Sequence, residues 1–188
     1  MSRYHHGETP ADGWQVGTDA PWAEVGSDRF VMTVPSEALV DVPDAEALMT
    51  FWDGVLDGMA AMEGTAAERP RAERFVVDRQ ISAGWMHSGY PIMAHLVSAE
   101  EVLSLEGLQA QGAWGPFHEL GHNHQYSDWI LPGTTETTCN LFSVYASEEH
   151  SGIDRGVAHS ALDPASRCLL YTSPSPRDQR GSRMPSSA

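Results

Sequence analysis

The segment FHELGHNH at residues 117–124 constrains the fold of this chain more than any other feature. Its histidines His118 and His122 are four residues apart, and Glu119 directly follows the first. Side chains four residues apart lie on the same face of an α-helix, so a helix lets both imidazoles reach one metal ion at about 2.0 to 2.1 Å. The motif therefore predicts a helix with two nitrogen ligands, and Glu119 positioned beside a water molecule on the ion.

A second helix is predicted after the turn at 131–133, because apolar residues recur there at helical spacing, at Leu141, Phe142, Val144 and Tyr145. Glu136 falls in its first turn, where a carboxylate can complete a site of two histidines and one glutamate. Such a site leaves a fourth position open for water, as in catalytic zinc centres. Glu148 and Glu149 are other candidates, but a rise of 1.5 Å per residue puts them about 18 Å away. Glu136 is therefore the preferred third ligand.

Three neighbouring residues have weaker predicted roles. Asn140 lies one turn after Glu136 and could orient a ligand, although a solvent-facing amide fits the pattern equally well. His124 points away from the ion if the first helix continues, which favours a polar surface position. Cys139 has no basic neighbour in sequence and is predicted to be a small buried apolar group.

The rest of the chain predicts one α+β domain. Strands are expected at 29–34, 74–81 and 92–97, where short apolar runs rich in β-branched and aromatic residues end in turn signals. A long helix is expected after Asp44, which can cap it, and a short one at 98–105 capped by Ser98. Residues 1–20 are polar and rich in glycine, so we expect a poorly ordered segment or the remnant of an upstream region.

The two predicted metal-binding segments together resemble those of a known protein family. The stretch WGPFHELGHNHQ at 114–125, then Trp129, Gly133 and TETTCNLFSVY at 135–145, resembles the enhancin-like, mucin-targeting zinc metallopeptidases, which pair HExxH with a downstream glutamate. Weaker similarities are PWAE at 21–24, TVPS at 33–36 and DRQISAGWMHSGYPIMAHL at 78–96. The resemblance implies a zincin-like domain of the gluzincin type over residues 21–167. Its carboxyl-terminal helical part would be incomplete, and the usual upstream β-rich module would be missing.

The same resemblance implies an activity. It predicts a zinc-dependent endopeptidase that cleaves glycoproteins, with mucin-like O-glycosylated proteins as substrates, one zinc ion as the cofactor, and an extracellular or cell-surface parent protein. By analogy with zincins, the strand residues Ile92, Met93, Ala94 and His95 could pair with the substrate backbone, with an ordinary core strand as the alternative. The alternative functions are a noncatalytic glycan- or protein-binding module on the same scaffold and an inactive fragment.

Charge and segment composition narrow the possible partners. The net charge of −15, from 26 acidic and 11 basic residues, argues against nucleic acid, because phosphate binding needs a basic surface. No stretch is apolar enough to insert into a membrane, and the amino terminus lacks the apolar core of a signal peptide. The sequence does not indicate an oligomeric state.

The last part of the chain changes abruptly in character at Cys168. The sequence CLLYTSPSPRDQRGSRMPSSA at 168–188 resembles the translation of a sequencing-library adapter, and it is predicted to be disordered. We expect the genuine coding sequence to end near Arg167.

Overall fold

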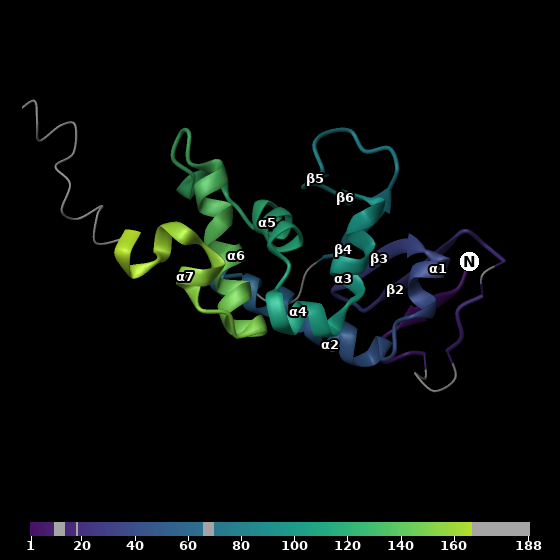
Figure 1. Cartoon of the computed structure of the whole chain (residues 1–188). Coiled ribbons are helices and arrows are strands. Elements are labelled where there is room, and N and C mark those ends of the chain that lie inside the picture. The colour runs from purple at the N-terminus through teal and green to yellow at the C-terminus, as the bar shows by residue number, and fades with distance from the viewer. Residues whose placement is uncertain (10–13, 18, 66–69, 167–188) are drawn as a thin grey trace, which may run out of the picture.

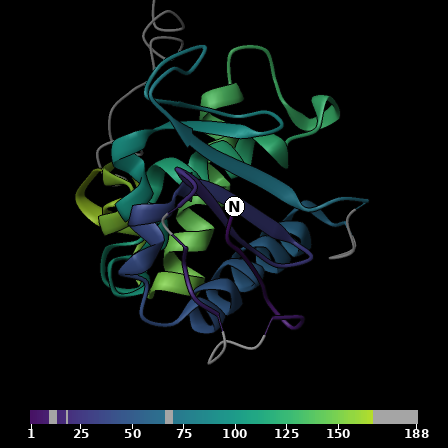
Figure 2. The ribbon, with the colours of Figure 1, turned by 90° about the vertical axis from the view of Figure 1, so that its right-hand side faces the viewer.

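The computed structural model describes residues 1–9, 14–17, 19–65 and 70–166. A mixed sheet forms one side of the molecule, and helices cover one of its faces (Figures 1 and 2). The predicted α+β fold is therefore confirmed. The adapter-like segment 168–188 lies outside the described residues, so its predicted origin and disorder stay predictions.

The sheet contains six strands in the spatial order β1-β2-β3-β4-β6-β5. Strands β2 and β3, and likewise β5 and β6, are antiparallel, whereas the other neighbouring pairs are parallel. In β3, β4 and β6 every second residue is buried, as expected for strands with one face against a core. The strands are β1 (Arg3–His5), β2 (Trp22–Gly26), β3 (Phe30–Pro35), β4 (Glu73–Asp78), β5 (Met86–His87) and β6 (Ile92–His95).

Helix α2 (Ala45–Glu63) is the main support of the sheet. It begins where predicted, because the Asp44 carboxylate accepts a hydrogen bond of 2.8 Å from the Ala47 amide. It ends at Gly64, whose φ of +83° is the left-handed conformation that glycine adopts easily. The buried face of α2 repeats at three- and four-residue intervals, with Ala45, Leu48, Met49, Trp52, Val55, Leu56, Met59 and Ala60.

One tryptophan links the sheet to the predicted metal-binding helix. Trp52 is fully buried, and its ring lies 5.0 Å from that of Phe30 in β3 and 5.8 Å from that of Phe117. Its indole N–H donates a hydrogen bond of 3.1 Å to the Val102 carbonyl. Trp52 therefore fixes how far the helix that carries Phe117 stands from the sheet.

The remaining helices are mostly short. They are α1 (Ser36–Val40), α3 (Ala99–Leu103), α4 (Leu105–Gln111), α5 (Trp114–Asn123), α6 (Thr135–Ser151) and α7 (Arg155–Ala158), with 3₁₀ helices η2 (Leu96–Ser98), η3 (Ser127–Trp129) and η4 (Ser160–Leu162). In the described part of the chain, none of the helices combines the length and the apolar character needed to cross a bilayer.

For Ile92, Met93, Ala94 and His95, the sequence left open a strand that pairs with the substrate and an ordinary core strand, and the sheet favours the second alternative. These residues form β6, which pairs with β4 on one side and with β5 on the other. The edge of the sheet nearest α5 is instead β5. Its two residues were too few to give a period-two pattern in the sequence.

Two further expectations need correction. Residues 3–5 belong to a segment expected to be poorly ordered or a remnant of an upstream region, but they form strand β1, where Tyr4 is 1% exposed and its ring packs edge-on against Trp14. Ser98 does not cap a helix through its side chain. It ends η2, and Ser104 caps the following helix, α4, by accepting a hydrogen bond from the Gly107 amide.

Candidate metal centre

The two histidines of the HExxH motif project from the same face of α5. Their Nε2 atoms are 3.2 Å apart, and the two rings are nearly perpendicular. The side chains are 18% and 14% exposed, so both rings are largely enclosed while their Nε2 atoms face each other. This is the arrangement that the four-residue spacing predicts for a helix.

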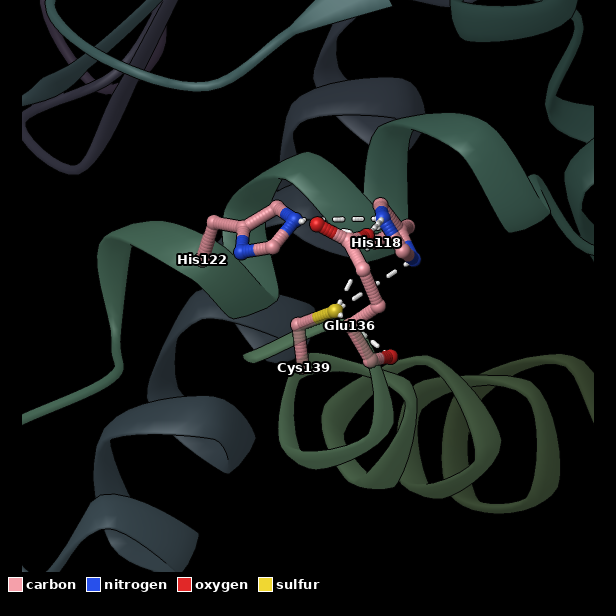
Figure 3. Close-up of side chains that lie close together, drawn as sticks. All are labelled: His118, His122, Glu136 and Cys139. Carbon is pink, nitrogen blue, oxygen red and sulfur yellow. Dashed lines mark hydrogen bonds and ion pairs between the residues drawn. The ribbon is translucent and has the colours of Figure 1, made fainter. Parts of the chain in front are cut away.

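Helix α6 brings a carboxylate to the same point. Glu136 lies in the first turn of α6, as predicted, and its Oε2 is 3.1 Å from Nε2 of His118 and 3.4 Å from Nε2 of His122 (Figure 3). Its side chain is 75% exposed, so the centre opens to solvent on the glutamate side. The other two acids considered, Glu148 and Glu149, lie near the opposite end of α6.

The three donor atoms have the spacing that a tetrahedral zinc ion requires. Ligands about 2.05 Å from a common centre at tetrahedral angles are about 3.3 Å from one another. The measured separations are 3.1, 3.2 and 3.4 Å. Two imidazoles and one carboxylate are also donors that zinc prefers, so the residues fit the ion in both chemistry and geometry.

The opposite nitrogen of each imidazole is held by an amide side chain. Nδ1 of His118 is 2.7 Å from Oδ1 of Asn140, and Nδ1 of His122 is 2.9 Å from Oε1 of Gln125. An amide oxygen accepts a hydrogen bond from the Nδ1–H group, which leaves the Nε2 lone pair free for a metal. Of the two positions considered for Asn140, the structure thus favours the one beside a histidine over a solvent-facing amide. The partner Gln125 was missed, because only the end of α5 and the following turn bring it back to His122.

Gln125 also connects the two helices. Its Nε2 donates a hydrogen bond of 2.7 Å to the Thr135 carbonyl and a second one to Oγ1 of Thr138. The same side chain therefore orients a histidine of α5 and fixes the first turn of α6, where Glu136 lies.

Close packing of α5 on α6 depends on Gly121. A Cβ atom at this position would lie 2.6 Å from the Cys139 carbonyl oxygen and 3.1 Å from Cβ of Phe142. The glycine in the motif therefore lets the main chain of α6 approach closely enough for Glu136 to reach the histidines.

Glu119 and Cys139 complete the surroundings of the donors. Glu119 is half-buried on α5. Cys139 is fully buried, as predicted, but it is not surrounded only by apolar groups, since its Sγ lies 3.5 Å from Nδ1 of His118. Burial, together with the negative charges of Glu136 and Glu119, raises the pKa of the Cys139 thiol to about 12. The metal-free thiol is therefore protonated at neutral pH.

His124 does not occupy the predicted surface position. It is fully buried, and its Nδ1 donates a hydrogen bond of 2.8 Å to the Leu120 carbonyl, while Nε2 lies 3.9 Å from the Glu63 carboxylate at the end of α2. The helical period correctly directs His124 away from the metal centre. It could not reveal that the end of α2 covers that side of α5.

Comparison with known proteins identifies the domain. Residues 1–167 match the family model "Peptidase M60, enhancin and enhancin-like". This chain belongs to the M60 peptidase family. The adapter-like segment at 168–188 lies outside this match.

Relatives and solved structures share this M60 domain. A TRPM8 channel-associated factor homolog from Xenopus laevis is 48% identical over 168 residues, which cover 87% of this chain and 19% of that protein. A functionally unknown conserved protein from Bacillus anthracis has a TM-score of 0.78 at 22% identity, covering 97% of this chain and 39% of that one.

A third match is the M60 catalytic domain of ZmpC from Clostridium perfringens, solved in complex with the sialyl T antigen. It has a TM-score of 0.65 at 14% identity, covering 82% of this chain and 34% of that one. These solved structures confirm the metallopeptidase fold, and family membership implies a bound metal ion. The chain spans only about a fifth of the length of the Xenopus relative, so the match covers one domain of that protein.

Proposed function

We propose that this M60 domain is a zinc-dependent endopeptidase that hydrolyses glycoproteins, with mucin-like O-glycosylated segments as substrates. The observation that carries the proposal is the set of three donor atoms from His118, His122 and Glu136, all 3.1 to 3.4 Å apart. Three protein ligands with a solvent-facing opening are typical of catalytic rather than structural zinc sites.

The residues of the site have separate roles in this reaction. His118, His122 and Glu136 would hold the zinc ion, which when bound would supply Lewis-acid chemistry for the scissile carbonyl and for a water molecule. Asn140 and Gln125 hold the two imidazoles so that both Nε2 atoms face the ion. Glu119 accepts the proton of the attacking water and passes it to the leaving amine as the peptide C–N bond breaks.

The substrate class is supported by a solved relative and by an exposed aromatic side chain. The M60 domain of ZmpC was solved with the sialyl T antigen, a glycan. In this chain Trp85 is 59% exposed, and its ring stacks on His95 at 5.1 Å, which leaves an aromatic surface beside the short edge strand β5. Such a surface suits stacking on sugar rings. Because such glycoproteins are extracellular, the proposal includes a parent protein that lies outside the cell or at its surface.

Substitution of Glu119 by Gln tests the peptidase proposal. With an O-glycosylated mucin peptide as substrate, we expect kcat/KM to fall by about 10²- to 10⁴-fold, while one zinc ion per chain remains bound. Glu149→Gln is the matched control, because it removes an equal charge from the exposed far end of α6 and should change neither property. Full activity of the Glu119→Gln variant, or no cleavage by the zinc-loaded wild type, would contradict the proposal.

A second candidate function is a binding module without catalysis. Relatives of this chain are called TRPM8 channel-associated factors, a name that describes association with a channel rather than hydrolysis. In that case zinc would only support the fold, and the zinc-loaded wild type would bind a glycoprotein without cutting it. The affinity for that glycoprotein would then be the same in the wild type and in the Glu119→Gln variant.

A further inference from the structure

Three hollows on the surface beside α4 share lining residues. The central hollow has a volume of about 520 Å³ and lies between the segment 41–43 and the junction of α3 and α4. It shares Leu105 with a hollow of about 530 Å³ beside the start of α2, and Glu100 and Ser104 with a third of about 360 Å³ that reaches Gly112. The three hollows form one continuous groove, which we call the α4 groove.

The α4 groove is separate from the metal centre. In the described part of the chain, no residue belongs both to the groove lining and to the donor set. Figure 1 shows α4 and α2 along the lower side of the molecule, below α5 and the hairpin of β5 and β6. A ligand in the groove would leave the metal centre open, so a role for the groove does not depend on the proposed peptidase activity.

The floor of the central hollow is apolar. Its apolar lining residues are Ala38, Val42, Pro43, Leu103 and Leu105. Ala38, Val42 and Leu105 pack against the hydrophobic core beneath them, so the fold holds the floor in place. Such a floor favours the burial of apolar side chains from a ligand.

The rim of the groove is acidic. Exposed carboxylates of Asp41, Glu100 and Glu106 line the central hollow, and those of Glu46 and Glu101 line its two neighbours. Among the described residues that line the three hollows, none is Arg, Lys or His. Within the described ranges these five carboxylates also form no ion pair. The rim therefore complements a ligand with several positive charges.

The spread of the carboxylates narrows the kind of ligand. Over the described residues, the only acid, histidine or cysteine group close enough to hold a metal ion is the one at the metal centre, so the rim does not suit a bound cation. Nucleic acid and anionic lipid would be repelled by the rim. A second copy of this chain, with its net charge of −15, would be repelled as well.

We propose that the α4 groove binds a basic amphipathic segment of a partner protein. Apolar side chains of that segment lie on the floor, and its Lys or Arg side chains lie against the acidic rim. Apolar anchors in a groove give such complexes their affinity, whereas complementary charges fix the orientation and speed the encounter.

A model peptide of Leu and Lys, with all Leu on one face of a helix, is the probe. In heteronuclear NMR spectra of the full chain, we expect its binding to shift signals of residues 38–47 and 97–112. Peptides with Ser in place of Leu, or with Glu in place of Lys, should each bind at least about 10-fold more weakly. The Glu119→Gln variant should bind the Leu and Lys peptide as the wild type does.

Two triple variants with equal loss of charge locate the contact. Replacing the three acids of the central hollow should raise Kd for the peptide about 10-fold, by Asp41→Asn, Glu100→Gln and Glu106→Gln. The matched control removes three exposed acids outside the groove and should change Kd by less than about twofold, by Asp28→Asn, Asp128→Asn and Glu149→Gln.

The wild-type spectra with the three peptides decide the proposal even if a triple variant fails to fold. No binding of the Leu and Lys peptide, or shifts confined to other surfaces, would overturn it. Equal losses in the two triple variants would reveal a general charge effect and overturn it too. Groove signals that shift with protein concentration alone would instead identify a second copy as the occupant. Each of these outcomes leaves the peptidase proposal intact.

Discussion

The tautomers of the two ligand histidines are set by side chains outside the donor set. Asn140 and Gln125 each place an amide oxygen within 2.9 Å of an Nδ1 atom, so each ring would present an unprotonated Nε2 to a metal ion. Both partners come from the region where α5 and α6 meet. The affinity for metal therefore depends on residues that do not touch it.

Replacing Asn140 by Ala should weaken zinc binding by about 10- to 100-fold, because the His118 ring loses the acceptor that fixes its orientation. Competition with a chromophoric chelator measures the change. Asn140→Asp keeps an oxygen at the same position and should retain most of the affinity. An alanine variant with wild-type affinity would show that packing alone orients His118.

At the scale of single residues, the sequence predicted the part of the site that follows from helical spacing. His118 and His122 are one helical turn apart, so their shared face could be predicted. Glu136 could be predicted from its position in the first turn of the next helix. The contacts of Cys139 and Gln125 could not be predicted, because they depend on how α6 folds back against α5. His124 was misplaced for the same reason, since its cover comes from α2.

At the scale of secondary-structure elements, the contact between α5 and α6 is the most sensitive one. Gly121→Ala should lower the free energy of unfolding by about 1 to 3 kcal/mol, because its Cβ would meet the main chain of Cys139 at 2.6 Å. Gly115→Ala on the same helix is the control. Its Cβ would meet only the flexible end of Met86 at 3.2 Å, so the loss should be small. Equal losses in urea unfolding of the two variants would refute this account.

The contact between α2 and α6 should make stability depend on pH. His150 packs against Gly54 and Gly58 of α2 and against the rings of Phe51 and Tyr145. In the described part of the chain its Nε2 has no hydrogen-bond partner. Burial lowers the pKa of His150, although the charge of Glu149 opposes this shift.

Because its pKa is lower in the folded protein, His150 binds a proton more readily in the unfolded chain. Its contribution to stability should therefore fall as the pH drops below the unfolded value of about 6.5, and the loss is complete below the folded pKa. We expect the stability advantage of the wild type over His150→Asn to shrink between pH 7 and pH 5 in urea titrations. A constant difference across that range would show that His150 does not titrate on unfolding.

Long elements were predicted more successfully than short ones. The buried apolar face of α2 spans many helical turns, and β4 and β6 carry continuous apolar runs. These patterns are therefore easy to detect in the sequence. Strands β1 and β5 have three and two residues and are defined by pairing with neighbours that only the folded chain supplies. That pairing also decided which strand lies at the edge of the sheet.

At the scale of the whole molecule, a metal ion held by His118, His122 and Glu136 would join two helices and should therefore stabilise the folded domain. At a free zinc concentration about 100 times Kd, binding adds about 2.7 kcal/mol. For a domain of this size we expect the chelated protein to melt about 5 to 10 °C lower by differential scanning calorimetry. The double variant His118→Ala, His122→Ala should melt at the same temperature with and without zinc. An equal zinc-dependent shift in that variant would place the ion elsewhere.

The hairpin of β5 and β6 is attached to α5 near both ends of that helix. Near the start, Met86 lies against Gly115, and at the end Asn123 exchanges hydrogen bonds of 3.0 Å with the backbone of Gly89 and donates one of 2.9 Å to Glu73 of β4. Because the hairpin is attached at two points, it can move only together with α5. The hairpin and the histidine ligands therefore form one mechanical unit, and force applied to the hairpin by a stretched polymer chain would be transmitted directly to the coordination geometry.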